Sequence, residues 1–200
     1  MAQSLCSYLK TQDPGIEISV VAPANTAAIA RRMPAVHDVV ETTFAHGRLH
    51  LKARWRIGHS LKKKRFSQAF VLPGSFKAAL VPFFAAIPLR TGYSGEPRWG
   101  LINDCRPKPR HKRDLMVDRF INLARTKTSI QKIAFPAPRL EADLSAPQTI
   151  FRRLNKKIKV RPVLALCPGA EFGPAKQWPP ASFASLANHA TAHGWQVWLM

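Results

Sequence analysis

Two glycine-containing loops hold the residues best suited to binding a phosphate. The first covers residues 72–77 (LPGSFK), between an apolar strand-like segment and an apolar helical segment. Free N–H groups at a helix N-terminus, with a cation nearby, favour an anion, and Ser75 and Lys77 stand at that point. The same spacing also fits a loop in which Ser75 only caps the helix and Lys77 is solvated. The residues alone leave both interpretations open.

The second loop covers residues 167–179 (CPGAEFGPAKQWP) and again joins an apolar strand-like segment to a helical one. Lys176 is its only cation and Glu171 its only carboxylate, while Trp178 can pack the loop against the protein. The glycine spacing matches neither a Walker A motif nor a dinucleotide fingerprint. A phosphate-binding site at Lys176 and a purely structural loop with Lys176 exposed are equally consistent with the residues.

Alternating helical and strand-like segments position these loops. Helical spacing or propensity predicts helices at 2–10, 23–33, 48–65, 76–85, 115–124 and 181–193. Apolar, mostly β-branched runs predict strands at 16–22, 36–42, 69–72, 87–93, 162–166 and 195–199. This order indicates a mostly parallel α/β sheet with right-handed crossovers. Ligands of such sheets bind at the carboxyl ends of the strands, where both loops would lie.

Two irregular segments divide the chain. Residues 105–113 read as a Pro/Lys/Arg loop, with Asp114 available to cap the next helix. Residues 135–147 are rich in proline and lose periodicity, which is typical of a linker. We therefore expect one domain over 1–147 and a second that begins at 148 and continues to 200.

The overall charge implies an anionic partner. The 200 residues contain 31 Lys and Arg against 11 Asp and Glu, a formal net charge of +20. Nucleic acid, a phosphorylated ligand and an anionic membrane surface all fit such a charge. Hydrophobic residues make up 46% of the chain, which argues against disorder. No apolar run approaches the ~20 residues of a transmembrane helix, and three widely separated cysteines predict neither a disulfide framework nor a zinc site.

Three basic clusters, at 48–65, 106–113 and 152–161, hold much of this charge. Trp55 and Phe66 lie in or beside the first cluster, so nucleic-acid binding has to be weighed. No basic zipper, RNP motif or zinc-finger spacing accompanies them. A solvated face that also adheres to anionic lipid is the more economical interpretation, since each surface cation contributes ~1 kcal/mol there. Nucleic acid is therefore not the expected partner.

Three stretches together carry a resemblance to a known family: CPGAEFGPAKQWP, VLPGSFKAALVPFFAAIPLRTGY and GEPRWGLINDC. The chain resembles, nearly end to end, the ADP-heptose:lipopolysaccharide heptosyltransferases of glycosyltransferase family 9, and among them the type II enzymes. The resemblance implies a GT-B fold of two Rossmann-like domains. It also implies transfer of heptose from ADP-heptose to a phosphorylated Kdo–lipid A inner-core acceptor. Such an enzyme needs no metal or other cofactor, and works in the cytoplasm at the inner face of the inner membrane, in peripheral contact with that anionic membrane.

The resemblance also implies roles for particular residues. Lys176 is similar to a lysine that contacts the donor's phosphates, and the donor pocket would be lined by Gly169, Ala170, Phe172 and Gly173. Lys77 and Arg98 match positions that face the cleft and the anionic groups of the acceptor. With neighbouring polar and basic side chains they give a predicted acceptor set of Lys77, Arg98, Ser75, Lys62, Lys64 and Arg65.

The departures from the family pattern concern both ends of the chain. Members of the family open on a strand and a glycine-rich loop with an aspartate, the proposed base, whereas residues 1–5 resemble the segment just after that loop. No residue here inherits the base, and Asp13 falls in a turn. The later D-S-G-x-x-H donor motif would lie beyond Met200. We therefore expect a first domain without its opening strand, a truncated second domain and impaired activity. The alternative is a nonenzymatic basic module that binds nucleic acid or anionic membrane.

Overall fold

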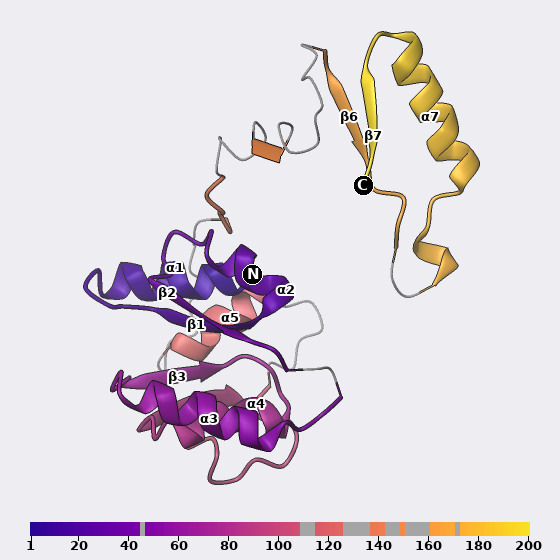
Figure 1. The fold of residues 1–200 in the computed structure, drawn as a ribbon. Helices are drawn as coiled ribbons and strands as arrows, with labels where there is room; N and C mark the ends of the chain where they lie inside the picture. The colour runs from indigo at the N-terminus through magenta and orange to yellow at the C-terminus, as the bar shows by residue number, and fades with distance from the viewer. Residues whose placement is uncertain (45–46, 109–114, 126–136, 143–148, 151–160, 171–172) are drawn as a thin grey trace. The chain divides into compact units, whose positions relative to one another are not determined.

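The chain forms two compact units, Met1–Ala142 and Asp143–Met200, which are considered separately (Figure 1). This computed structural model describes residues 1–44, 47–108, 115–125, 137–142, 149–150, 161–170 and 173–200. The predicted domain boundary between 147 and 148 falls at the edge of a segment outside the described residues and stays a prediction.

Parallel strands form the framework of the first unit. Strands β1 (Ser19–Pro23) and β2 (Asp38–Thr42) pair in parallel. Strands β3 (Gln68–Val71), β4 (Leu89–Tyr93) and β5 (Asp104–Arg106) form a second parallel sheet in the order β3-β4-β5. The prediction of parallel strands is confirmed. The carboxyl ends of β3 and β4 lie together, because Val71 is in register with Gly92.

Five helices of the first unit agree with the predicted positions to within a few residues: α1 (Ala2–Gln12), α2 (Ala24–Ala30), α3 (Leu51–Lys62), α4 (Phe76–Phe84) and α5 (Met116–Ala124). Helix α3 is shorter than the predicted segment 48–65 because His50 and Arg65 take up left-handed backbone at its two ends. Strand β5 overturns the prediction of a loop from residue 105. Its pairing with distant β4 is what makes those residues extended. Leu115 precedes α5 as N-cap, and Asp114 lies outside the described residues.

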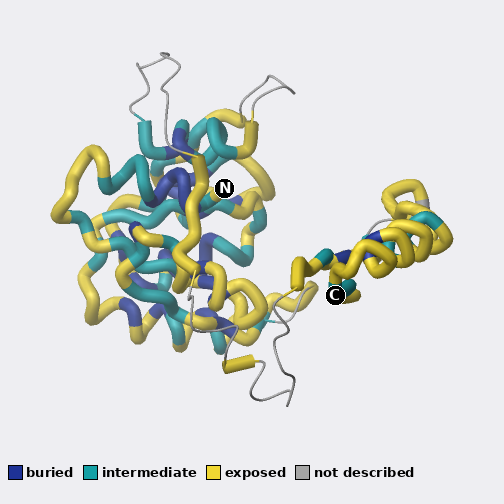
Figure 2. The backbone as a smooth tube through the Cα atoms, turned by 90° about the horizontal axis from the view of Figure 1, so that it is seen from above, coloured by how far each residue is buried: buried dark blue, intermediate teal, exposed yellow. Residues whose placement is uncertain are grey.

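Helices α3 and α4 pack side by side and enclose much of the apolar core (Figure 1). Leu61 joins Val81, Ala85 and Ile87 in a cluster of buried side chains, part of the buried interior seen in Figure 2. At the other end of α3, Arg54 Nη1 donates to the Lys77 carbonyl oxygen over 2.9 Å. The two helices therefore run in the same direction. The beginning of α3 lies with the carboxyl end of β3, and residues 62–65 lie at the opposite end of the sheet.

The described residues from 161 to 200 in the second unit form a β–loop–α–β motif, as predicted. Strands β6 (Val163–Leu166) and β7 (Gln196–Leu199) pair in parallel, with helix α7 (Pro180–Ala192) between them in sequence. The loop between β6 and α7 contains a short 3-10 helix, η1 (Pro174–Lys176). Trp178 packs edge-on against Phe183, with ring centroids 4.9 Å apart. This contact joins the end of the loop to the first turn of α7, and Trp178 remains 50% exposed.

Candidate functional site

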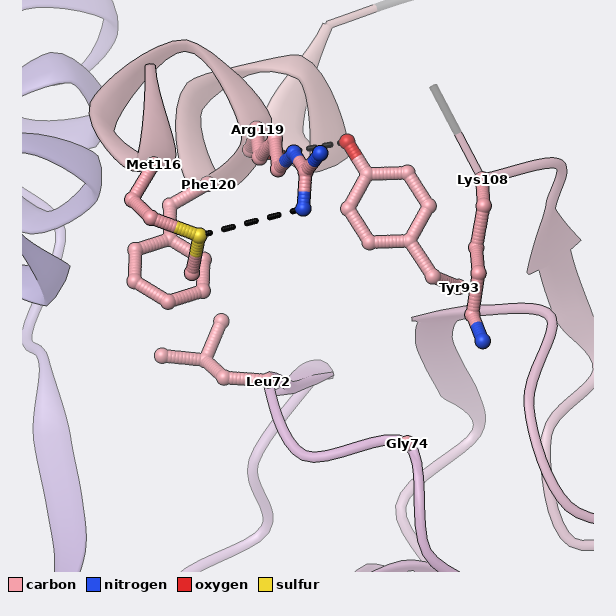
Figure 3. Close-up of a pocket in the computed structure, with 7 residues that line it drawn as sticks. All are labelled: Leu72, Gly74, Tyr93, Lys108, Met116, Arg119 and Phe120. Atoms are coloured by element: carbon pink, nitrogen blue, oxygen red, sulfur yellow. Dashed lines mark hydrogen bonds between the residues drawn. The ribbon is translucent and has the colours of Figure 1, made fainter. Parts of the chain in front are cut away.

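A pocket of about 230 Å³ opens at the carboxyl ends of β3 and β4, where a parallel sheet is expected to bind its ligand (Figure 3). Leu72 directly follows β3, Tyr93 ends β4 and Lys108 follows β5. Helix α5 supplies one wall. The lining residues are Leu72, Gly74, Tyr93, Lys108, Met116, Arg119 and Phe120.

The pocket combines an apolar wall with cations. The Tyr93 hydroxyl donates to the Arg119 carbonyl oxygen over 2.5 Å and fixes α5 to the end of β4. Arg119 Nη1 lies 3.9 Å from the sulfur of Met116. Arg119 Nε is buried and has no hydrogen-bond partner within the described part of the chain. Lys108 and Arg119 are the cations among the residues that line the pocket. The pocket thus suits an anionic or hydroxyl-rich ligand that also has an apolar surface.

The loop between β3 and α4 differs from both interpretations that its residues allowed. Ser75 is the N-cap residue, but its side chain makes no cap hydrogen bond. Instead the Phe76 N–H donates to Glu96 Oε2 over 2.8 Å, and the Glu96 N–H donates to the Gly74 carbonyl oxygen over 3.1 Å. The Glu96 carboxylate therefore occupies the N-terminus of α4, the position at which the sequence allows a bound phosphate. Lys77 lies half-buried in the first turn of α4.

Arg98 holds the two loops at this end of the sheet together. Its side chain is 6% exposed, Nη1 donates to the Pro73 carbonyl oxygen over 2.8 Å, and Nη2 donates to the Tyr93 carbonyl oxygen. Burial lowers the pKa of the guanidinium, which nevertheless stays charged in proteins. The loops touch so closely that a Cβ on Gly95 would lie 2.3 Å from the Gly74 oxygen. Arg98, expected on the acceptor face, therefore lies in the interior with backbone carbonyls as its partners.

No residue of the predicted acceptor set lines the pocket, and three of the set lie at the other end of the sheet. Lys62, Lys64 and Arg65 are exposed at the far end of α3, beside the start of β2. Lys64 pairs with Asp38, and this hydrogen bond and charge hold the pKa of the Asp38 carboxyl below its ordinary value. These cations lie at the amino ends of the strands, so they do not join Ser75 and Lys77 in one site.

The predicted donor residues share the loop between β6 and α7 in the second unit. Gly169 is exposed, and Ala170 is half-buried with its carbonyl oxygen 3.5 Å from Gln177 Nε2. Gly173 has φ +107°, a conformation that L side chains rarely adopt. Lys176 is exposed at the end of η1, and its N–H donates to the Gly173 carbonyl oxygen over 3.2 Å. Phe172 lies outside the described residues.

Sequence reasoning missed the residues that build the pocket wall. Tyr93 and Arg119 were assigned only to a strand and a helix, and Lys108 only to a basic cluster. Tyr93 could have been found from its place at the carboxyl end of a predicted strand. Arg119 and Glu96 could not, because only the packing of α5 and of the loop after β4 brings them to this end of the sheet.

Metal-binding clusters and membrane-spanning helices are both absent from the described residues. No three His, Cys, Asp or Glu side chains among them are grouped so that they could hold a metal ion. Within the same ranges, every helix is too short or too polar to cross a membrane.

Residues 54–200 match the family model described as glycosyltransferase family 9 (heptosyltransferase). The chain belongs to this family. Lipopolysaccharide heptosyltransferase 2 of Escherichia coli K12 is 43% identical to it over 202 residues, and that of Salmonella typhimurium LT2 is 42% identical over 201 residues. Each match covers 98% of this family 9 chain and 58% of the relative. The chain thus spans somewhat more than half the length of these curated relatives.

A solved structure supports the predicted fold of this family 9 chain. The structure of E. coli ADP-heptose lipopolysaccharide heptosyltransferase II matches with a TM-score of 0.86 and 38% identity, covering 99% of the chain and 59% of the solved chain. A family 9 glycosyltransferase from Veillonella parvula matches with a TM-score of 0.77 at 15% identity, which shows the fold alone. The predicted α/β class of GT-B type is confirmed.

Proposed function

We propose that this chain is part of an enzyme that transfers heptose from ADP-heptose to the phosphorylated inner core of lipopolysaccharide. Family membership over residues 54–200 is the observation that carries the proposal. Identity above 40% to two lipopolysaccharide heptosyltransferases supports the particular sugar and acceptor class.

The first unit is proposed to bind the acceptor at its pocket. Arg119 and Lys108 give cations to an anionic group of a Kdo–lipid A inner core. The apolar side chains of Leu72, Met116 and Phe120 face the non-polar side of a sugar ring. In this proposal Arg98 and Glu96 position the loop that carries Ser75 and Lys77. In the same proposal, Lys62, Lys64 and Arg65 are not part of the acceptor site.

The second unit is proposed to bind the diphosphate of the donor. Lys176 is the only cation of the loop at 167–179, and it lies at the carboxyl end of β6 on a glycine-rich backbone. A cation there would stabilise the charge that develops on the departing diphosphate. Gly169 and Gly173 would let the ligand approach the backbone closely, and Ala170 and Phe172 would line the same pocket.

The proposed reaction is a direct displacement at the anomeric carbon of the heptose. The acceptor hydroxyl oxygen forms a bond to that carbon, the bond from the carbon to the diphosphate oxygen breaks, and ADP leaves with the electron pair. The hydroxyl proton goes to a base that no residue of this chain is assigned to supply. We therefore expect residues 1–200 alone to be impaired in transfer.

Two further expectations belong to the same proposal. The enzyme would act in the cytoplasm, in peripheral contact with the anionic inner face of the inner membrane, because its acceptor is held in that membrane. Transfer would need no metal or cofactor, so a chelator should leave the rate unchanged. The opposing hypothesis, a nonenzymatic basic module, is disfavoured by membership of a transferase family.

The test is a chimera in which this chain replaces the matching 202 residues of the E. coli enzyme. Incubated with ADP-heptose and an inner-core acceptor, it should add one heptose, seen as a mass increase of the acceptor, and release ADP. Absence of transfer by a folded chimera would overturn the proposal. Tight, steeply salt-dependent binding to duplex DNA, with no response to ADP-heptose, would favour the basic module.

A further inference from the structure

The outward side of helix α3 is an unusual surface, which we call the outer face of α3: Leu51, Lys52, Trp55, Arg56 and His59. All five side chains are exposed. Leu51 is 49% exposed and Trp55 is 53% exposed, although both are large apolar residues. The opposite side of the helix is buried through Arg54, Gly58 and Leu61. The exposed side of α3 thus carries aliphatic and aromatic groups among its cations, in addition to the apolar groups that its other side contributes to the core.

Packing holds this face rigidly in place. A Cβ on Gly58 would lie 2.5 Å from Phe84 Cβ and 2.8 Å from the Val81 carbonyl oxygen, so α3 touches α4 backbone to backbone. Arg54 donates to the carbonyl oxygens of Leu49 and Lys77, over 2.7 Å and 2.9 Å, and its guanidinium lies 4.1 Å above the Phe44 ring centroid. Since the buried side is fully engaged, α3 cannot turn Trp55 inwards.

The charge around the outer face has one sign. No acidic residue occurs between Glu41 and Glu96 in the sequence, while the cations on or beside the outer face include Arg48, Lys52, Arg56, Lys62 and Lys63. The rings of Trp55 and His59 stack, with centroids 5.4 Å apart and planes 20° from parallel. A helix that combines Trp and Leu with many cations, and carries no acid, is typical of binding in the plane of an anionic lipid surface.

We propose that the outer face of α3 is the surface that docks on anionic lipid, with Trp55 at the level of the headgroups. Tryptophan is favoured at that level because its ring is apolar and its N–H is polar. The exposed aliphatic side chain of Leu51 gains from burial among acyl chains, and has no comparable partner on a nucleic-acid backbone. Lipid is therefore favoured over nucleic acid.

The direction of α3 connects this surface to the pocket. Through Arg54 and Lys77, the first half of α3 lies at the carboxyl end of β3, the end at which the pocket opens. Docking by Trp55 and Lys52 thus brings a membrane-held acceptor to the correct end of the sheet. This inference rests on the proposed function for its acceptor but needs no donor for its test.

The experiment measures partitioning of the 200-residue chain onto vesicles of phosphatidylcholine mixed with phosphatidylglycerol, and onto phosphatidylcholine alone. The wild type should bind only the anionic vesicles. The variant Lys52→Gln/Arg56→Gln should partition about 25-fold more weakly, from about fivefold for each cation removed. At high salt, where the charges are screened, the wild type should keep part of its vesicle binding, and Trp55→Ala should lose that part. Brominated lipid should quench wild-type fluorescence more than that of Trp55→Phe.

The matched control is Arg32→Gln/Arg161→Gln, which removes two exposed cations outside α3 and gives the same net charge. Its partitioning should change less than twofold, and circular dichroism should show every variant folded. Equal losses in the control and the α3 variant would mean that only net charge matters, and would overturn the assignment. The assignment would also be overturned if the wild type did not bind the anionic vesicles. It would be overturned as well if duplex DNA, at the same total negative charge, displaced the protein from the vesicles. No outcome depends on heptosyl transfer, which the chimera tests separately.

Discussion

Replacement of Arg98 by methionine tests whether this residue positions the loops at the end of the sheet or contacts the acceptor directly. Arg98 is 6% exposed, and its guanidinium donates hydrogen bonds to the carbonyl oxygens of Pro73 and Tyr93. Methionine keeps an apolar stem of similar length but leaves both carbonyls without that donor. Each buried polar group left without a partner costs about 1–3 kcal/mol. Removal of a buried charge offsets part of this, so we expect a net loss of about 2–4 kcal/mol, a large share of the about 5–15 kcal/mol available to a domain.

The assay is urea unfolding of the first unit's transition, with the unfolding of the second unit analysed separately. The free energy of unfolding of Arg98→Lys should lie between those of wild type and Arg98→Met, because an ammonium does not reproduce the planar fork of the guanidinium. Arg56→Met, at an exposed position, should stay within about 0.5 kcal/mol of wild type. If Arg98→Met also stays within that range while acceptor binding is lost, then Arg98 contacts the acceptor directly and the positioning role is wrong.

Three other predictions concern packing, capping and pH. Gly58→Ala should destabilise by up to about 2 kcal/mol in thermal unfolding, because a clash of about 1–3 kcal/mol at Phe84 and Val81 opposes a gain of about 1 kcal/mol in helix propensity. A stabilised variant would contradict this. Glu96→Ala should cost about 0.5–2 kcal/mol by removing the cap of α4, and an unchanged melting temperature would show that water caps it equally well. Asp38, whose pKa lies below the ordinary 3.8, contributes stability above that pH and loses it as the pH falls. The melting temperature of Asp38→Asn should therefore vary less with pH below about 4 than that of wild type, and parallel curves would argue against the Lys64 pair.

The helices and parallel strands were predictable because their signals are local. Apolar spacing in α4 and α7 and the β-branched run in β1 are visible without any tertiary contact. Strand β5 was missed because Asp104, Cys105 and Arg106 carry no strand signal. They are extended only through pairing with β4.

The candidate site was predictable in place, but none of the six residues predicted for the acceptor lines the pocket. The carboxyl-end loops after β3 and β6 follow from the order of elements alone. The roles of Glu96 and Arg98 depend on backbone groups some twenty residues away, at Phe76 and Pro73, and no spacing rule reports such partners. The cations at 62–65 were grouped with Ser75 and Lys77 by their charge, whereas α3 places them at the opposite end of the sheet.

The central claim is that the pocket of the first unit binds the acceptor while the loop of Lys176 binds the donor. The most direct measurement is the KM for each substrate in the chimera, with Arg119→Met and Lys176→Met introduced separately. Arg119→Met should raise the acceptor KM by about tenfold or more, from the loss of a charged hydrogen bond of about 1.5–3 kcal/mol, with the ADP-heptose KM unchanged. Lys176→Met should raise the ADP-heptose KM and leave the acceptor KM unchanged. If Arg119→Met leaves the acceptor KM unchanged, or moves both constants together, the assignment of the pocket is wrong.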